Sequence, residues 1–398
     1  MAARVLLTTT MQWPSVARLA GAFADVGAEV EALLPAGHVA ARSRFVARTH
    51  AYDPLFPRGA LGRAVAQAAP DLVVPCDDRA LAQLLALRGH DALLARSLGE
   101  PSSYPTLMTR RDFICAARDA GLLAPRTVRI DRASDLEAGL RETGCPAVLK
   151  VDGSWGGDGT AVVHDIEQAR SAFARLAMTP SRGRSVMRAF LRGDAHFLRD
   201  ALRPPAPVVN LQAFVPGKPA TSAFACWKGR VLASIHMDVL ETLHDRGPAT
   251  VMRRVDCLQM ERAAVQLAER FGLSGLHGLD FVRDEQGRPH LIEMNPRATQ
   301  ASAFALGQGH DLAAALLGCL TPAARWPRPL LTENPVIALF PQEWRRDPAS
   351  PWLHSAYPDV PWDDPAVLRA CLAPGQKPPE RHRPEPAPAL TLRQAVGR

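Results

Sequence analysis

Short apolar runs alternate with helical patterns in the first hundred residues. Runs typical of buried strands cover residues 4–8, 29–34 and 71–75, and apolar residues at helical spacing cover residues 15–26 and 80–87. Strand, helix and strand at these lengths indicate βαβ units, whose strands pair in parallel. We therefore predict an α/β domain with a Rossmann-like parallel sheet at the start of the chain.

The third of these strands is followed by two neighbouring carboxylates, Asp77 and Asp78. Open α/β sheets present ligands at the carboxyl ends of their strands, but an N-cap of the following helix is the role that we favour here. The first strand is followed by TTMQWP and not by a G-x-G-x-x-G turn. A dinucleotide site is therefore not indicated in this domain.

A glycine-rich segment separates two predicted strands in the middle of the chain. One strand ends at Lys150, and the next covers residues 160–164. The loop between them contains Gly153, Gly156, Gly157 and Gly159. Glycines at this density let backbone N–H groups approach an anion closely, although a Walker A loop would have its lysine after the glycines. A mobile turn is the alternative, and Lys150, one of only four lysines in the chain, favours the anion site.

Carboxylates lie inside apolar runs in a predicted hairpin further along the chain. Residues 278–282 and 290–295 read as strands around a turn at residues 284–287. One interpretation of Asp280 and Glu293 is that they face the solvent on an ordinary edge hairpin. It is disfavoured because the surrounding runs, LHGLDFV and LIEMN, are apolar.

The alternation of side chains along a strand places Glu293 and Asn295 on one face of this hairpin. Asp280 falls on the same face if the turn holds an even number of residues, and a slip of one residue would put it on the other. Two carboxylates and an amide oxygen make an oxygen-rich site that suits Mg²⁺ shared with phosphates. Arg297 follows at the strand end and could neutralise a developing phosphoryl or carboxylate charge.

Further strands and helices follow from the same patterns. Strands are predicted at residues 125–130, 208–215, 220–227, 231–235 and 336–344, and helices at residues 110–120, 133–143, 182–203, 257–270 and 312–319. Arg253 and Arg254 are predicted to lie in the connection before the helix at residues 257–270. Their side chains could either contact the phosphate site or face the solvent. From Pro374 the proline-rich composition predicts a loosely packed tail.

Composition narrows the class of protein. The chain has 398 residues and a net charge of +7, but its basic residues are spread along the sequence without interleaved aromatics, so we expect no nucleic-acid partner. Seven cysteines without a CxxC pair indicate free thiols in a reducing compartment. No apolar run approaches the ~20 residues that a membrane span needs, and no signal peptide is visible. We expect a cytoplasmic protein without a membrane partner.

The order of KVDGSWGGDGT, LQAFVPG and GLDFV…LIEMNPR resembles the ATP-grasp superfamily of ATP-dependent carboxylate–amine or thiol ligases. The resemblance covers residues 101–322 and implies an α+β ATP-grasp fold whose two subdomains clasp ATP, at about residues 101–207 and 208–322. Residues 1–100 resemble the Rossmann-like domain that precedes this fold in the family. Residues 323–398 would form a C-terminal extension with its proline-rich tail, and they match no member of the family that we can name.

The resemblance also implies roles for individual residues. Lys150 and Arg110 would contact the phosphates, and the loop that contains Gly153, Gly156, Gly157 and Gly159 would close over them. The adenine would meet Gln212, Ala213 and Val215. Mg²⁺, with Mn²⁺ as an alternative, would be held by Asp280, Glu293 and Asn295, and Arg297 would steady the transferred phosphoryl group or the acyl phosphate, so that Arg297 and Lys150 are the catalytic candidates. The residue that contacts the ribose is left open, because PGKPAT after the hinge lacks the usual acid or histidine.

The activity that the resemblance implies is an ATP-dependent ligase, most simply one that forms a carbon–nitrogen bond. A small-molecule carboxylate would become an acyl phosphate, and an amine or other nucleophile would displace phosphate. Two alternatives stay open: a nucleotide-binding regulatory protein without catalysis, and a carboxylase-type member that uses bicarbonate. A homodimer is also left open.

Overall fold

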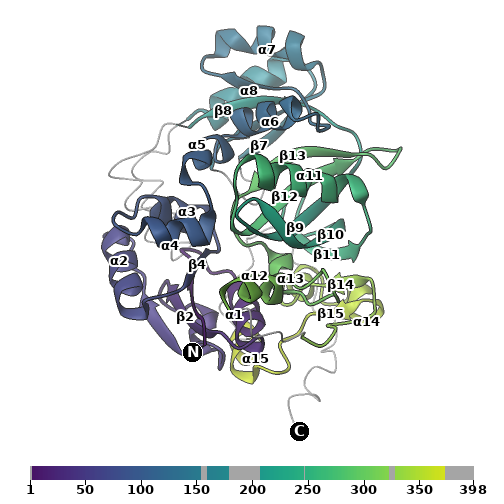
Figure 1. Ribbon diagram of the computed structural model, residues 1–398. Coiled ribbons are helices and arrows are strands. Elements are labelled where there is room, and N and C mark those ends of the chain that lie inside the picture. Colours follow the sequence, from purple (N-terminus) through teal and green to yellow (C-terminus); the bar gives the residue numbers. More distant parts are fainter. Residues whose placement is uncertain (1, 154–158, 179–206, 246, 322–327, 373–398) are drawn as a thin grey trace.

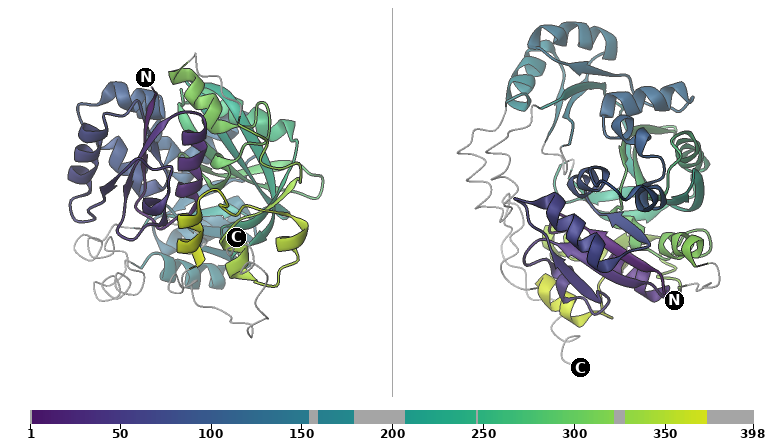
Figure 2. Two further views of the ribbon diagram at one scale, coloured as in Figure 1. Left: turned by 90° about the horizontal axis from the view of Figure 1, so that it is seen from below. Right: turned by 60° about the vertical axis from the view of Figure 1, so that its left-hand side comes forward.

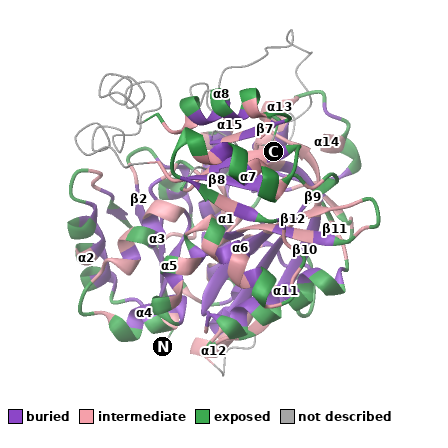
Figure 3. Ribbon diagram, turned by 90° about the horizontal axis from the view of Figure 1, so that it is seen from above, coloured by how far each residue is buried: buried purple, intermediate pink, exposed green. Residues whose placement is uncertain are grey.

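The computed structural model describes residues 2–153, 159–178, 207–245, 247–321 and 328–372. These residues form three sheets, of which one is parallel and two are largely antiparallel (Figure 1). The N-terminal sheet and the seven-stranded sheet lie side by side, and the body around the other four-stranded sheet projects from them (Figure 2). Helices cover the sheets, with their buried sides inward and their exposed sides outward (Figure 3).

The N-terminal sheet confirms the predicted Rossmann-like domain. Its strand order is β3 (Arg48–Ala51), β2 (Glu29–Leu34), β1 (Arg4–Thr8) and β4 (Leu72–Pro75), all parallel. The helices of this domain are α1 (Ser15–Asp25), η1 (Val39–Arg42), α2 (Pro57–Ala68), α3 (Asp78–Leu85) and α4 (Asp91–Leu98). β1 and β4 are almost wholly buried because helices cover both faces, which is why they read as continuous apolar runs. β3 was not predicted, since its sequence RTHA lacks an apolar pattern.

A four-stranded antiparallel sheet forms the smallest body, which we call the small sheet. Its strand order is β5 (Thr127–Ile130), β8 (Val209–Ala213), β6 (Ala147–Val151) and β7 (Thr160–Val163). Helices η3 (Ala133–Asp135), α7 (Leu136–Thr143) and α8 (Ile166–Leu176) cover it. Leu149, Leu211 and Phe173 belong to its hydrophobic core, which is separate from the other cores. Residues 182–203, predicted as a helix, lie outside the described residues.

The seven-stranded sheet, which we call the large sheet, carries most of the C-terminal half. Its strand order is β13 (Pro289–Asn295), β12 (Gly275–Arg283), β9 (Lys218–Trp227), β10 (Arg230–Thr242), β11 (Ala249–Arg254), β14 (Val336–Ala338) and β15 (Tyr357–Pro358). Helix α11 (Leu258–Arg270) packs on one face, and α12 (Leu312–Leu320) packs on the other. The predicted connection around Arg253 was wrong, because these residues form β11 at the end of a long hairpin.

Two hydrophobic cores join the N-terminal domain to the large sheet. One contains α1 residues together with α12 and β10 residues, and the other contains residues of α2 to α4 together with α11 and β12 residues. Three short helices follow α4 in the sequence and precede the small sheet. They are η2 (Pro101–Ser103), α5 (Tyr104–Leu107) and α6 (Arg110–Asp119). Phe113 and Ile114 of α6 belong to the second shared core. α6 therefore packs with the large sheet.

Residues 328–372, which we call the C-terminal segment, contact both the large sheet and the N-terminal domain. β14 extends the large sheet beside β11, and the predicted strand at residues 336–344 ends early because α13 (Gln342–Arg346) begins after a proline. Helices α14 (Trp352–Ser355) and α15 (Pro365–Leu372) follow. Asp359 pairs with Arg18 at 2.6 Å, and Asp364 accepts a hydrogen bond from Ser43 at 2.5 Å. The domain boundaries near residues 100, 207 and 322 remain predictions, and the tail beyond residue 372 lies outside the described residues.

The helices of the structure are too short or too polar to cross a membrane, as far as the described residues show.

Glu343 offers a test of how firmly the C-terminal segment is attached. Its buried carboxylate accepts hydrogen bonds from Thr250 of β11 at 2.6 Å, from Arg346 at 2.5 and 2.7 Å, and from Ser350. We expect Glu343→Ala to lower the free energy of unfolding by about 3 kcal/mol, because it removes the buried acceptor of Thr250, Arg346 and Ser350. Urea unfolding measures this change. Glu285→Ala, in an exposed turn, is the control, and equal midpoints for the two variants would contradict the attachment.

Candidate nucleotide and metal site

The β12–β13 hairpin brings the predicted carboxylates together. Asp280 and Glu293 are directly opposite each other across the two strands, and Gly278 is opposite Asn295. Directly opposite residues project from the same face, so both carboxylates and the Asn295 amide share one face of the large sheet. A bulge follows, since the next pair is Phe281 with Leu291 and leaves Ile292 as an extra residue.

The pKa of Asp280 is raised by its surroundings. Burial raises the pKa of the Asp280 carboxyl, and the neighbouring Glu293 carboxylate raises it further. The Asn295 amide donates a hydrogen bond to Asp280 Oδ2 at 2.8 Å, which opposes the shift. Two carboxylates that destabilise each other's charge are a suitable place for a divalent cation.

Arg297 is held by two partners from different parts of the chain. Its Nη2 donates to Asn295 Oδ1 at 3.0 Å, within the hairpin. Its Nε and Nη2 donate to Asp78 of the N-terminal domain at 2.8 and 3.3 Å. The resulting fork fixes the plane of the guanidinium at the edge of the carboxylate site.

The two carboxylates after β4 have separate functions. Asp77 is the N-cap of α3, as favoured from the sequence, and accepts from the Ala80 backbone N–H at 2.9 Å. Its oxygens also accept from the hydroxyl groups of Thr9 and Thr10 at 2.8 and 3.0 Å. Asp78, the first residue of α3, instead pairs with Arg297. No pattern in the sequence indicates this pair, because 219 positions separate its members.

Lys150 reaches the same place from the small sheet. It lies on β6 opposite Thr160 and Asn210, and only 7 % of its surface is exposed. Burial lowers the pKa of the Lys150 amine to about 8, while attraction to Glu293 opposes this change. Arg110 lowers the pKa further, and Asp280 raises it. The amine therefore lies within the electrostatic field of both hairpin carboxylates.

Arg110 connects the small sheet to the hairpin. It begins α6, and its Nη2 donates to Glu293 Oε1 at 2.7 Å. Its Nη1 donates to the Val151 carbonyl and lies 3.8 Å from Asp152 Oδ1. One guanidinium thus contacts the residues that follow Lys150 and a carboxylate on the opposite side of the site.

Asp152 and Asn210, two polar residues near Lys150, were not predicted from the sequence as part of the site. Asn210 of β8 is fully buried and donates its Nδ2 hydrogen bond to Asp152 at 2.8 Å. Its Oδ1 is buried without a hydrogen-bond partner in the described part of the chain. No motif points to either side chain, since single Asp and Asn residues near a glycine loop are common.

The glycine loop is described only at its two ends. Gly153 adopts a positive φ of 68°, which favours glycine, and the Gly159 carbonyl accepts from the Val151 N–H at 2.9 Å. Gly156 and Gly157 lie outside the described residues, so closure of this loop over a phosphate stays a prediction.

The predicted adenine residues lie at the end of β8. The Gln212 side chain is buried and donates to Thr127 Oγ1 at 3.0 Å and to the carbonyl of the bulged Ile292 at 3.4 Å. The Ala213 N–H donates to the Arg126 carbonyl at 2.8 Å, so an adenine contact at this residue would use its carbonyl. Val215 follows the strand and is partly exposed. Gln212 therefore connects the small sheet to the hairpin.

The donor set fits Mg²⁺ better than zinc. Among the described residues, no group of three or more His, Cys, Asp and Glu side chains could hold a metal by itself. Two carboxylates and one amide oxygen leave coordination positions for phosphate oxygens, which is how Mg²⁺ is usually bound beside a nucleotide.

Comparisons with known proteins agree with this fold. A family model described as "ATP-grasp domain" matches residues 118–301. No curated protein sequence matches the chain.

Three solved structures illustrate the similarity. N5-carboxyaminoimidazole ribonucleotide synthetase from Thermus thermophilus is 18% identical, with a TM-score of 0.56 over 78% of this chain and 77% of that chain. The biotin carboxylase domain dimer of Hydrogenobacter thermophilus 2-oxoglutarate carboxylase, in complex with MgADP, ADP and bicarbonate, is 14% identical (TM-score 0.55; 80% and 70% covered). An L-amino acid ligase from Bacillus licheniformis is 13% identical (TM-score 0.55; 82% and 77% covered). Residues 118–301 thus match an ATP-grasp domain, and the chain shares the fold of these structures, including their N-terminal parallel-sheet domain.

Proposed function

We propose that the protein is an ATP-dependent ligase that binds Mg-ATP between the small sheet and the β12–β13 hairpin. The observation that carries this proposal is the meeting of two groups of opposite charge. Asp280 and Glu293 project from the hairpin, while Lys150 and Arg110 face them from β6 and α6. Such a site can hold a polyphosphate through its cations and a divalent ion through its carboxylates.

Each residue would have a defined role in this site. Lys150 and Arg110 would contact the phosphates, together with backbone N–H groups of the loop from Gly153 to Gly159. Gln212, Ala213 and Val215 would border the adenine. Mg²⁺, or Mn²⁺ in its place, would be held by Asp280, Glu293 and Asn295, and it would supply neutralisation of the phosphate charge.

The chemistry needs little covalent help from the protein. An oxygen of the substrate carboxylate attacks the γ-phosphorus, the bond to the β-phosphate oxygen breaks, and ADP leaves. An amine then attacks the acyl carbon, phosphate leaves, and the amine loses a proton. Arg297 would stabilise the negative charge of the transferred phosphoryl group, and its fork with Asp78 fixes where that help is given.

The ion pair between Arg110 and Glu293 would have to change when the nucleotide binds. Glu293 Oε1 accepts from Arg110 at 2.7 Å, which is the place where a cation would bind to this carboxylate. With Mg-ATP present, Mg²⁺ would bind the Glu293 carboxylate in place of Arg110, and a phosphate would pair with the Arg110 guanidinium in place of Glu293. Both exchanges conserve the pairing of charges, so neither group is left buried without a partner.

The similar structures support two candidate reactions. The likeness to an L-amino acid ligase favours the formation of a carbon–nitrogen bond with small-molecule substrates. The likeness to a biotin carboxylase domain solved with bicarbonate favours the carboxylase alternative, in which bicarbonate alone would stimulate ATP cleavage. A protein that binds ATP without either reaction would be a regulator. A homodimer and a cytoplasmic location stay predictions.

Removing the charge of Glu293 tests the metal site. We expect Glu293→Gln to reduce ADP release by at least about 100-fold in the presence of a panel of amino acids and small carboxylates, because the cation loses a charged ligand. A coupled assay of ADP measures this change, and circular dichroism checks the fold. Glu285→Gln is the control. Unchanged turnover in Glu293→Gln would argue against the site.

The pKa of Lys150 predicts a pH dependence of nucleotide binding. Because this pKa is lowered to about 8, the ammonium form is lost as the pH rises through 8, and Mg-ATP affinity should then fall about tenfold per pH unit. Titration calorimetry between about pH 7.5 and 9.5 measures it. Lys150→Arg keeps its charge and should bind with a flat profile. The same decline in both proteins would exclude Lys150 as its source.

Asp78 is predicted to position Arg297. We expect Asp78→Asn to lower kcat at least about tenfold with Mg-ATP affinity unchanged, because the guanidinium loses one side of its fork while the phosphate contacts remain. Asp78→Glu should recover part of the rate. Asp91→Asn, at the first position of α4, is the control. A parallel loss of nucleotide affinity would show that Asp78 acts on the whole site.

A further inference from the structure

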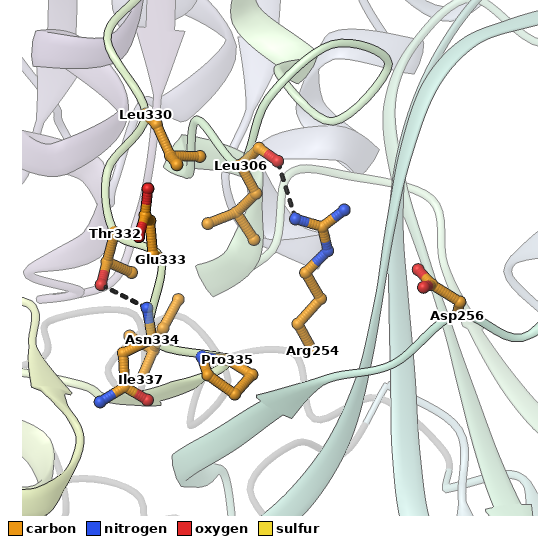
Figure 4. A pocket seen from close by; sticks show the side chains of 9 residues that line it. All are labelled: Arg254, Asp256, Leu306, Leu330, Thr332, Glu333, Asn334, Pro335 and Ile337. Atoms are coloured by element: carbon orange, nitrogen blue, oxygen red, sulfur yellow. Dashed lines mark hydrogen bonds between the residues drawn. The ribbon is translucent and has the colours of Figure 1, made fainter.

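A second pocket lies at the edge of the large sheet, where β11 ends. Its cavity volume is about 360 Å³, within the range of sites for small organic ligands. Arg254 and Asp256 line it from β11 and the residues that follow, and Leu306 lines it from the segment after the hairpin. The remaining wall belongs to the C-terminal segment and consists of Leu330, Thr332, Glu333, Asn334, Pro335 and Ile337 (Figure 4).

The pocket is separate from the nucleotide site, although the two share a face of the sheet. The cross-strand row that contains Glu293 and Asp280 continues through Thr221 and Met237 to Arg254. Three strand intervals separate Asp280 from Arg254, which amounts to about 15 Å at the usual strand spacing. A ligand beside Arg254 would therefore leave room for the nucleotide.

Arg254 is held in place as a fixed cation. Its backbone N–H donates to the Pro335 carbonyl at 2.7 Å, and its Nη1 donates to the Leu306 carbonyl at 2.9 Å. The side chain is partly buried and extends into the pocket toward Leu306 (Figure 4). The neighbouring Arg253 is exposed and projects from the other face of the sheet, opposite Asp238.

The charges in this pocket do not neutralise one another. Asp256 and Glu333 supply carboxylates from two sides, yet within the described ranges neither they nor Arg254 forms an ion pair within 4.0 Å. Leu330 is 46% exposed beside them, and the buried Leu306 and Ile337 add apolar surface. The pocket thus combines a guanidinium, two carboxylates and a small apolar wall.

We propose that this pocket binds a small amino acid. The α-carboxylate would pair with Arg254, the α-ammonium would lie toward Asp256 and Glu333, and a short apolar side chain would contact Leu330 and Ile337. A zwitterion meets both signs of charge at once, whereas a simple carboxylate or a simple amine would meet one of them and be repelled by the other. This site goes beyond the proposed ligase reaction and does not depend on it.

Titration calorimetry on the full chain without nucleotide tests the proposal. The probes are alanine and valine, with N-acetylalanine lacking the ammonium and alaninamide lacking the carboxylate. We expect the two amino acids to bind and both analogues to bind at least about tenfold more weakly. Equal binding of all four, or no binding of the amino acids, would overturn the proposal.

Three variants assign the site. Arg254→Gln should lose at least about tenfold in amino acid affinity, and Arg253→Gln should keep it, although the two differ by one position. Glu293→Gln should also keep it while losing ADP release, so failure of the nucleotide site is distinguished from failure of this pocket. Thermal unfolding checks that each variant is folded. Equal affinities in Arg254→Gln and Arg253→Gln would place the amino acid elsewhere and refute the assignment.

Discussion

The charged residues of this molecule are arranged around two opposed carboxylates. Asp280 and Glu293 share one face of a hairpin, where burial and the Glu293 carboxylate raise the pKa of Asp280. Positive groups reach them from three parts of the chain, with Lys150 on the small sheet, Arg110 on α6 and Arg297 just after the hairpin. The fold holds these cations beside the pair of anions, and Arg110 pairs directly with Glu293 at 2.7 Å.

Much of this arrangement could be predicted from local patterns. The alternation of side chains determines the face of each residue within a strand, so Glu293 and Asn295 were correctly placed together. Asp280 was expected on this face only if the turn held an even number of residues, yet five residues, 284–288, separate the pair of Arg283 and Pro289. It is the bulge that shifts the register by one residue and brings Asp280 opposite Glu293. The bulge at Ile292 could not be foreseen, because no residue type there demands it. It turns a carbonyl group toward Gln212 of the small sheet.

Contacts between distant segments could not be predicted. The pair of Asp78 with Arg297 joins two domains, and no property of either residue identifies its partner. The strands β3 and β11 were missed for a related reason, since their polar residues form strands only because neighbouring strands supply hydrogen-bond partners. The contact between Asp152 and Asn210 likewise depends on the pairing of β6 with β8.

The separate core of the small sheet has a consequence for the cost of moving it relative to the rest of the molecule. The N-terminal domain and the large sheet share two hydrophobic cores, whereas the small sheet has a core of its own. The small sheet touches the rest of the molecule near the site through polar contacts, from Gln212 to Ile292 and from Arg110 to Val151 and Asp152. A displacement of the small sheet would therefore break these polar contacts, at a modest cost for each hydrogen bond, while its own core moved with it.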